Sequence, residues 1–387
     1  TIALAREAPR LHHRAPSRER SNQEAGLATV DISSLKQRLE RLSGAGLAGT
    51  DVAAETLALA EGIQRLAIAG TRSSERALMA RMSRLMDDAS GKAFTTAMTD
   101  QAFRCRSPRR VANQIRYLLN RYGIPGYFSA FERSQLAGFK ARAGLVPNLL
   151  APAVRARLRS EMSQVVLPGE AGPLARRLAA RSAEGVRINL NHLGEAILGE
   201  AEAEVRVASY IKDISRPDIQ CVSVKISSMA SQIHLLAREE TLEVLCDRMR
   251  RLYRAAMAHP HIHRDGSESP KLVYLDMEEY RDLDLTCALF KRVLGEEEFS
   301  ECAAGIVLQA YLPDAHPYQR DLTRWAQERI EAGGAPIRLR IVKGANLAME
   351  QFEAAHRGWE QAPYGTKAEV DANYKRMVTW GCDPGRA

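Results

Sequence analysis

Cysteine is sparse in this sequence, and no two cysteines form a C-x-x-C pair. The six lie far apart along the chain, at Cys105, Cys221, Cys246, Cys287, Cys302 and Cys382. A structural zinc site or a disulfide framework needs closely spaced or paired cysteines. The spacing argues against both and favours a reducing compartment such as the cytoplasm.

Long apolar runs are also missing. No segment approaches the roughly 20 apolar residues that a membrane-spanning helix needs, and no signal peptide with an apolar core opens the chain. We therefore expect a soluble protein. Its formal net charge of +8 is compatible with attraction to nucleic acid, anionic lipid or an anionic substrate, and charge alone does not choose among them.

Three regions differ in composition along the 387 residues. Residues 1–30 are rich in Arg, Ser, Pro and His, which predicts a disordered basic tail. Residues 31–180 carry leucines and other apolar residues at helical spacing and are expected to be all-α. Residues 181–387 change to short apolar runs alternating with amphipathic stretches. This alternation is typical of βα units around a parallel sheet.

Five strands are predicted in the last region, each followed by a helical stretch. The strands are Val186–Asn191, Ile219–Ile226, Lys271–Asp276, Gly305–Tyr311 and Ile337–Gly344. The helical stretches are Glu195–Ile211, Glu239–Met257, Leu283–Phe290, Tyr318–Ala332 and Ala368–Trp380.

Three local patterns have both a functional and an ordinary interpretation. The G-x-G-x-x-G at Gly44, Gly46 and Gly49 follows a charged helical stretch rather than a strand. Dinucleotide binding requires a preceding strand, so we favour a turn between helices, with Asp51 as the N-cap of the second helix.

The other two patterns are histidine-rich and arginine-rich. His259, His261 and His263 alternate near Asp265 without a familiar zinc spacing, so a solvated loop is favoured over a metal site. The basic stretch 104–121 could bind nucleic acid or lipid, but it is more typical of the solvated face of an amphipathic helix.

A stronger signal is found at the ends of the five predicted strands. They close on Asn191, Lys225, Asp276, Gln309, and Arg340 with Lys343. In a parallel sheet these ends share one edge, where loops that carry active sites emerge. The mixture of charges suits an anionic small molecule together with a polar heterocycle.

Five strings make a resemblance to a known family specific. They are LGEA (193–196), VSVKISS (222–228), YLDMEEYRD (274–282), GIVLQAYLPDA (305–315) and RIVKGAN (340–346). In order and spacing they resemble the proline dehydrogenase domain of bacterial proline utilization A. The resemblance implies an N-terminal helical arm and linker region followed by a (β/α)8 barrel of the TIM type. Only five of its βα units are present in this sequence.

The same resemblance implies a role for each matched residue. Lys225 would bind the carboxylate of L-proline, and Asp276 and Arg340 would lie beside the flavin of FAD, with Arg340 near N5. Gln309, Lys343, Gly344 and Ala345 would complete the cofactor site. The implied activity is oxidation of L-proline to pyrroline-5-carboxylate with hydride transfer to the flavin and electrons passed to a membrane quinone.

The resemblance also raises expectations about the parent protein. A cytoplasmic enzyme peripheral to the inner membrane, a fused aldehyde dehydrogenase domain and a homo-oligomer would fit the family. Strands 6 to 8 and a carboxylate-binding arginine pair of the family lie beyond Ala387, so we expect a fragment with weak FAD binding and little activity. Two alternatives stay open: a barrel enzyme of another chemistry, such as one that binds phosphate, and a non-catalytic helical or degenerate-barrel fragment.

Overall fold

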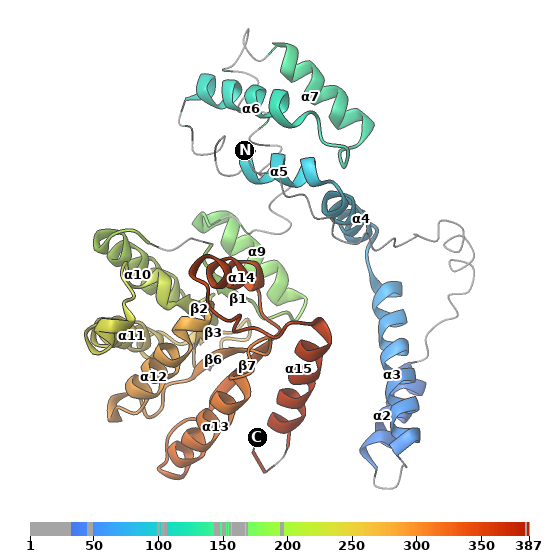
Figure 1. Ribbon diagram of the computed structural model, residues 1–387. Helices are drawn as coiled ribbons and strands as arrows, with labels where there is room; N and C mark the ends of the chain where they lie inside the picture. Colours follow the sequence, from blue (N-terminus) through green and yellow to red (C-terminus); the bar gives the residue numbers. More distant parts are fainter. Residues whose placement is uncertain are drawn as a thin grey trace. The chain divides into compact units, whose positions relative to one another are not determined.

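A computed structural model of the chain describes residues 32–44, 49–98, 107–142, 169–193 and 197–383, with a few isolated positions besides. It divides into two compact units, Thr1–Gln164 and Val165–Ala387 (Figure 1). The tail predicted for residues 1–30 and the Gly194–Ala196 part of the LGEA string lie outside the described residues.

Helices are the regular structure of the first unit within its described residues. Its helices are α2 (Ile32–Ser43), α3 (Gly49–Gly70), α4 (Ser73–Asp87), α5 (Ala89–Ala97), α6 (Pro108–Tyr122) and α7 (Ala130–Arg142). Gly44 follows α2 and Gly49 begins α3, so the glycine pattern lies between two helices, and Gly46 is outside the described residues. The predicted N-cap at Asp51 is wrong, because Asp51 lies in the first turn of α3.

The basic stretch 104–121 largely coincides with α6. Ser107 caps this helix by accepting a hydrogen bond from the Arg110 amide, and Pro108 occupies its first turn, where a missing N–H costs nothing. One face buries Val111, Ile115 and Leu119 within a small apolar core of α5, α6 and α7, while the described arginines of the helix are exposed. The arrangement is that of an ordinary amphipathic helix.

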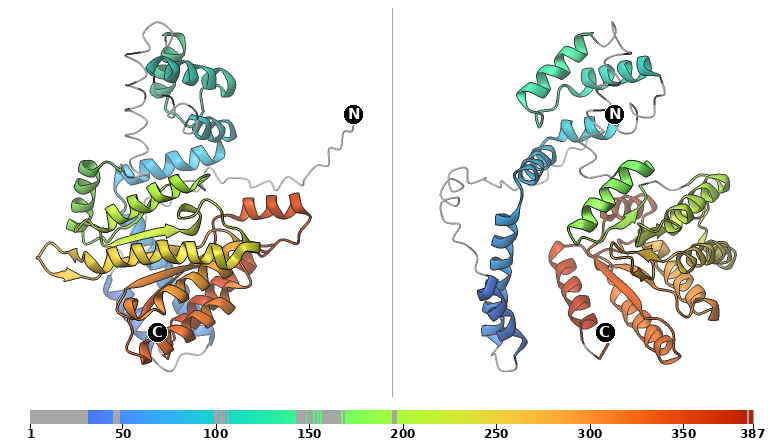
Figure 2. Two further views of the ribbon diagram at one scale, coloured as in Figure 1. Left: turned by 90° about the vertical axis from the view of Figure 1, so that its left-hand side faces the viewer. Right: turned by 180° about the vertical axis from the view of Figure 1, so that it is seen from behind.

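The second unit contains a parallel five-stranded sheet within its described residues. The strands occur in the order β1 (Asn189–Asn191), β2 (Cys221–Lys225), β5 (Leu272–Asp276), β6 (Ala304–Gln309) and β7 (Ile337–Val342). The helices are α9 (Ala171–Ala183), α10 (Glu200–Ile214), α11 (Arg238–Ala258), α12 (Leu283–Leu294), α13 (Ala315–Glu331), α14 (Leu347–Arg357) and α15 (Lys367–Gly381). The views of Figure 2 show the helices arranged along the strands. The expected fold class, helices followed by part of a TIM-type barrel, is confirmed.

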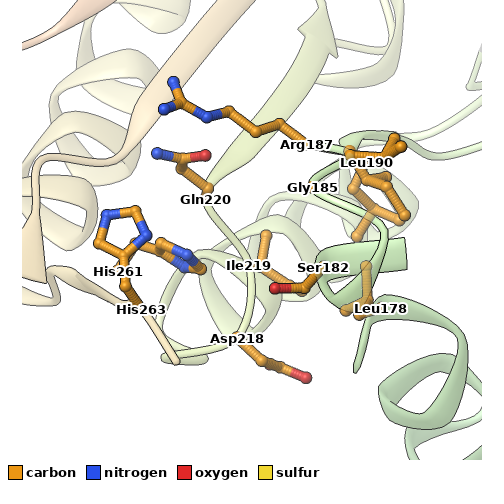
Figure 3. Close-up of a pocket in the computed structure, with 12 residues that line it drawn as sticks. Leu178, Ser182, Gly185, Arg187, Leu190, Asp218, Ile219, Gln220, His261 and His263 are labelled. Carbon is orange, nitrogen blue, oxygen red and sulfur yellow. The ribbon is translucent and has the colours of Figure 1, made fainter. Parts of the chain in front are cut away.

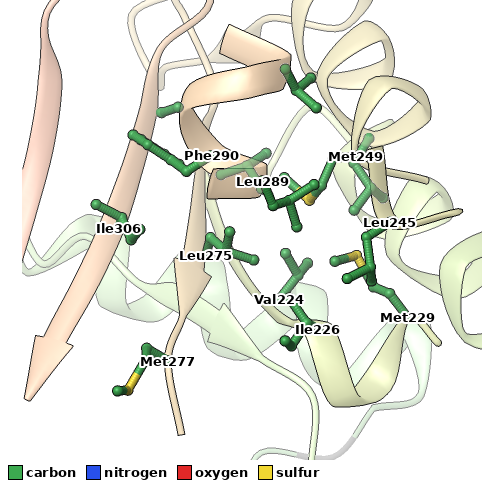
Figure 4. Packing of buried hydrophobic residues seen from close by; sticks show 14 of the residues in the cluster. Val224, Ile226, Met229, Leu245, Met249, Leu275, Met277, Leu289, Phe290 and Ile306 are labelled. Atoms are coloured by element: carbon green, nitrogen blue, oxygen red, sulfur yellow. The ribbon is translucent and has the colours of Figure 1, made fainter. Parts of the chain in front are cut away.

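Alternate side chains of each strand form the core with the surrounding helices. Val224, Leu275 and Ile306 are buried on one face of the sheet. Figure 4 shows them against Leu245 and Phe290 among the packed residues from α11 and α12. Side chains alternate between the two faces of a strand. The neighbours of these core residues, such as Tyr274 and Gly305, therefore lie on the opposite face of the sheet.

Three features differ from the prediction. The histidine-rich segment expected to be a solvated loop instead forms a short antiparallel hairpin of β3 (His261–Ile262) and β4 (Glu268–Ser269) between α11 and β5. His263 Nε2 lies 2.9 Å from Ser269 Oγ across it. Helix α14 was not predicted, and α10 begins at Glu200 rather than Glu195.

No helix in the described part of the chain is long and apolar enough to cross a lipid bilayer. Nor do the described residues bring three or more His, Cys, Asp or Glu side chains together in a way that could hold a metal ion.

Candidate active site at the carboxyl edge of the sheet

The sheet face opposite the helices is polar. The strand register determines which residues lie side by side on this face. It pairs Ser223 with Tyr274, Tyr274 with Gly305, and Gly305 with Arg338. One layer nearer the carboxyl edge, Lys225 pairs with Asp276, and Val307 with Arg340. Since the strands are parallel, residues far apart in the sequence converge on one edge, which is where parallel barrels carry their active sites.

Tyr274 forms the floor beneath this edge. Its ring occupies the space that a side chain at position 305 would fill, because a Cβ on Gly305 would lie 2.3 Å from Tyr274 Cε1. The Arg340 guanidinium lies 5.1 Å from the centre of the same ring, within the range of a cation–π contact. The glycine of β6 therefore lets Tyr274 support the arginine of β7.

Asp276 is the most buried charged side chain at the edge. Arg340 Nη2 donates to Asp276 Oδ1 at 2.7 Å, and Asn191 Nδ2 lies 3.4 Å from Asp276 Oδ2. The carboxylate is only 10% exposed. Burial raises the pKa of Asp276, although the charge of Arg340 acts in the opposite direction. Arg340 Nε is buried and makes no hydrogen bond within the described structure, so the arginine keeps a donor for another group.

Glu278, two residues beyond Asp276, connects the ends of four strands. Its carboxylate accepts from Lys225 Nζ at 2.5 Å and from Ser227 Oγ at 3.1 Å. Its backbone carbonyl accepts from Gln309 Nε2 at 2.9 Å and from Asn346 Nδ2 at 3.2 Å. The sequence prediction did not include Glu278, even though it lies within the YLDMEEYRD string.

The segment after β7 contributes backbone as well as side chains. Gly344 has φ +124°, and a Cβ there would lie 2.4 Å from the ring of Tyr311, so the position favours glycine. The Ala345 amide donates to Gln309 Oε1 at 3.3 Å.

The predicted residues therefore fall into three groups of contacts. Asp276 meets Arg340, while Lys225, Gln309 and, through Gln309, Ala345 meet at Glu278. Lys343 pairs instead with Asp371 of α15 at 2.5 Å.

Two surface pockets flank the sheet. One of about 570 Å³ lies at the carboxyl edge, with Leu235, Tyr280 and Trp359 in its wall. The other, of about 270 Å³, lies at the amino-terminal edge between the segments that lead into β1 and β2 and the β3–β4 hairpin. Figure 3 shows Arg187, Gln220, His261 and His263 around it. The strand-end residues described above belong to the carboxyl edge.

Solved structures similar to this chain are proline utilization A proteins. The protein from Corynebacterium freiburgense is 42% identical over 61% of this chain and 24% of its own, with a TM-score of 0.55. The Bdellovibrio bacteriovorus protein, inactivated by N-propargylglycine in its structure, is 26% identical over 90% of this chain and 32% of its own, with a TM-score of 0.60. The chain thus spans a third or less of the length of these proteins.

No curated protein matches the chain. A family model described as proline dehydrogenase matches residues 174–383, which include the whole parallel sheet and every strand-end residue discussed above. The chain belongs to the proline dehydrogenase family.

Proposed function

We propose that the protein carrying this chain oxidises L-proline to pyrroline-5-carboxylate with FAD as cofactor and passes the electrons to a quinone. The observation that carries the proposal is the Asp276–Arg340 pair on the polar face of the sheet, with Arg340 Nε buried and unbonded. A fixed cation with a spare donor suits a ring that becomes more electron-rich on reduction. Family membership and the similarity to proline utilization A proteins support the same activity.

The residues present fit a flavin. Gln309 offers a side-chain amide and Arg340 supplies positive charge, while Gly344 leaves room for the Tyr311 ring beside them. Bound flavin supplies a two-electron acceptor for the hydride lost from the proline ring carbon, while the ring nitrogen loses a proton and a C=N bond forms.

Lys225 is proposed to bind the substrate carboxylate. Its ammonium stands at the end of β2 and is 20% exposed, so it can make charge-assisted hydrogen bonds to an incoming anion. Asp276 and Tyr274 hold Arg340 in place. The main work of these residues is orientation and electrostatics.

The test uses the intact protein. We expect a flavin absorption spectrum after purification and proline-dependent reduction of a dye acceptor. Arg340→Met should lower kcat/KM by roughly 10²-fold, as expected for removal of one electrostatic contact to the reacting centre. Arg338→Met is the matched control, because Arg338 lies one layer deeper on the same face of β7.

The possible outcomes separate the parts of the proposal. Absence of flavin would refute the cofactor. Bound flavin that proline does not reduce would refute the substrate and favour a barrel enzyme of another chemistry. Equal losses in the two arginine variants would refute the special role of Arg340.

A further inference from the structure

A protein carboxylate, that of Glu278, bonds the lysine that the proposed function assigns to the substrate. Lys225 Nζ bonds Glu278 Oε1 at 2.5 Å, and Ser227 Oγ holds Oε2 at 3.1 Å. The two side chains are 20% and 33% exposed, respectively. To bind the Lys225 ammonium, an incoming carboxylate therefore has to compete with the Glu278 carboxylate.

The local charges make simple addition of a second carboxylate unfavourable. Lys225 and Arg340 bring two positive charges, and Asp276 and Glu278 bring two negative ones. Asp276 interacts electrostatically with both Lys225 and Glu278. A carboxylate that joined the ammonium beside Glu278 would repel that glutamate at close range in a partly dehydrated site.

The Glu278 side chain can move while its backbone stays in place at the end of β5. Its backbone carbonyl is held from two directions, by Gln309 Nε2 and Asn346 Nδ2. Its carboxylate, by contrast, is a third exposed and is held only by Lys225 and Ser227 within the described contacts. The side chain can therefore turn toward water while the backbone keeps the edge of the sheet intact.

We propose that Glu278 is a positioning residue for the substrate carboxylate: it holds Lys225 in place until the substrate binds and is then displaced from it. The inference rests on the proposed function, because it needs Lys225 to bind a carboxylate. Glu278 thereby lowers the affinity for any ring carboxylate, whether or not the ring contains nitrogen.

The decisive variant is Glu278→Gln in the intact protein. It keeps the side-chain shape, the backbone carbonyl and an acceptor oxygen for Lys225, and it removes the charge; the new amide NH2 in place of Oε2 can donate to the Ser227 hydroxyl. The Kd of L-proline and the Kd of cyclopentanecarboxylate should both fall by roughly fivefold, the upper range for one partly exposed ion pair. For proline oxidation, KM should fall in parallel while kcat changes little.

Two further variants supply controls. Glu279→Gln removes the same charge one residue away, where the carboxylate pairs with Arg281 at 2.7 Å, and it should leave both Kd values nearly unchanged. Ser227→Ala removes the hydroxyl that holds Glu278 and should tighten binding in the same direction but by less. This second variant keeps the proposal testable if Glu278→Gln folds poorly.

The outcomes distinguish this inference from the proposed function. If the wild-type protein binds neither compound, the proposed function fails. If it binds both, Lys225→Met abolishes binding and Glu278→Gln leaves or weakens it, the inference alone is wrong. Weaker binding of proline with unchanged binding of cyclopentanecarboxylate would show that Glu278 recognises the ring ammonium, which also overturns the inference.

Discussion

Replacing Arg340 by methionine should destabilise the second unit in a way that depends on pH. The change removes the guanidinium that bonds Asp276 at 2.7 Å but keeps an apolar side chain in place of the aliphatic part of the arginine. Asp276 stays 90% buried and retains only the long 3.4 Å contact from Asn191 and a hydrogen bond from Ser223. The charge of the carboxylate thus loses its main compensation.

The size of the effect follows from the burial of the pair. Removing one partner of a fully buried ion pair costs about 3–5 kcal/mol. Arg340 is 36% exposed, so solvent screening reduces its share, and we expect a loss of about 2 kcal/mol at neutral pH.

The sign of the pH dependence follows from the raised pKa of Asp276. Burial already holds this pKa above its ordinary value, and loss of Arg340 raises it further. Between the unfolded and folded pKa values the folded state binds more protons, so stability falls as pH rises through that window. The deficit of the variant should therefore be small near about pH 4.5 and full at about pH 7.

Urea unfolding followed by tryptophan fluorescence measures this effect. All three tryptophans, Trp325, Trp359 and Trp380, lie in the second unit, so the signal reports on the unit that contains the site. Adding Asp276→Asn to the variant should restore at least half of the lost free energy. The reasoning is refuted if the deficit is equal at both pH values, or if the second substitution adds to the loss.

Three further predictions concern the same unit. Gly344→Ala should cost more than about 2 kcal/mol, because φ is +124° and a ring carbon lies 2.4 Å from the new Cβ; Gly358→Ala, with φ +68° and open space, should cost about 1 kcal/mol. Thermal unfolding compares the two. Gly305→Ala should lower Tm less in a Tyr274→Ala background than alone, since the Cβ clash is with that ring. Burial lowers the pKa of Lys271 from 10.5 to about 8, so the unfolded state binds more protons over this range, and wild-type stability relative to Lys271→Met should rise as pH increases through it in urea titrations.

The parallel sheet was predictable because its signal is local. Each apolar run between amphipathic stretches lies within three residues of the strand found, as for Lys271–Asp276 and the observed Leu272–Asp276. Helix α14 was not predicted although its sequence is amphipathic; Met349 and Phe352 remain 64% and 65% exposed in it. The hairpin was missed because its two-residue strands are shorter than any periodic pattern can reveal.

The site was predictable only in part, for a related physical reason. Strand ends identify which side chains share an edge, and this was sufficient to select Lys225, Asp276 and Arg340. Which of them touch depends on tertiary packing: Lys225 bonds Glu278 rather than Asp276, and Lys343 bonds Asp371. The importance of Glu278 comes from four contacts to three other strand ends, and no single-sequence pattern contains that information.

The alternation of apolar and polar faces along the strands also limits how this chain can change in length during evolution. Insertion of one residue within β5 would exchange Leu275 and Asp276 between the helix-facing core and the polar face. A single such insertion would damage the core and the site together. Length variation is instead expected in the connections, as in the α11–β5 connection that contains the β3–β4 hairpin. That hairpin borders the pocket at the amino-terminal edge, so this connection can lengthen or shorten while the carboxyl ends of the strands keep their register.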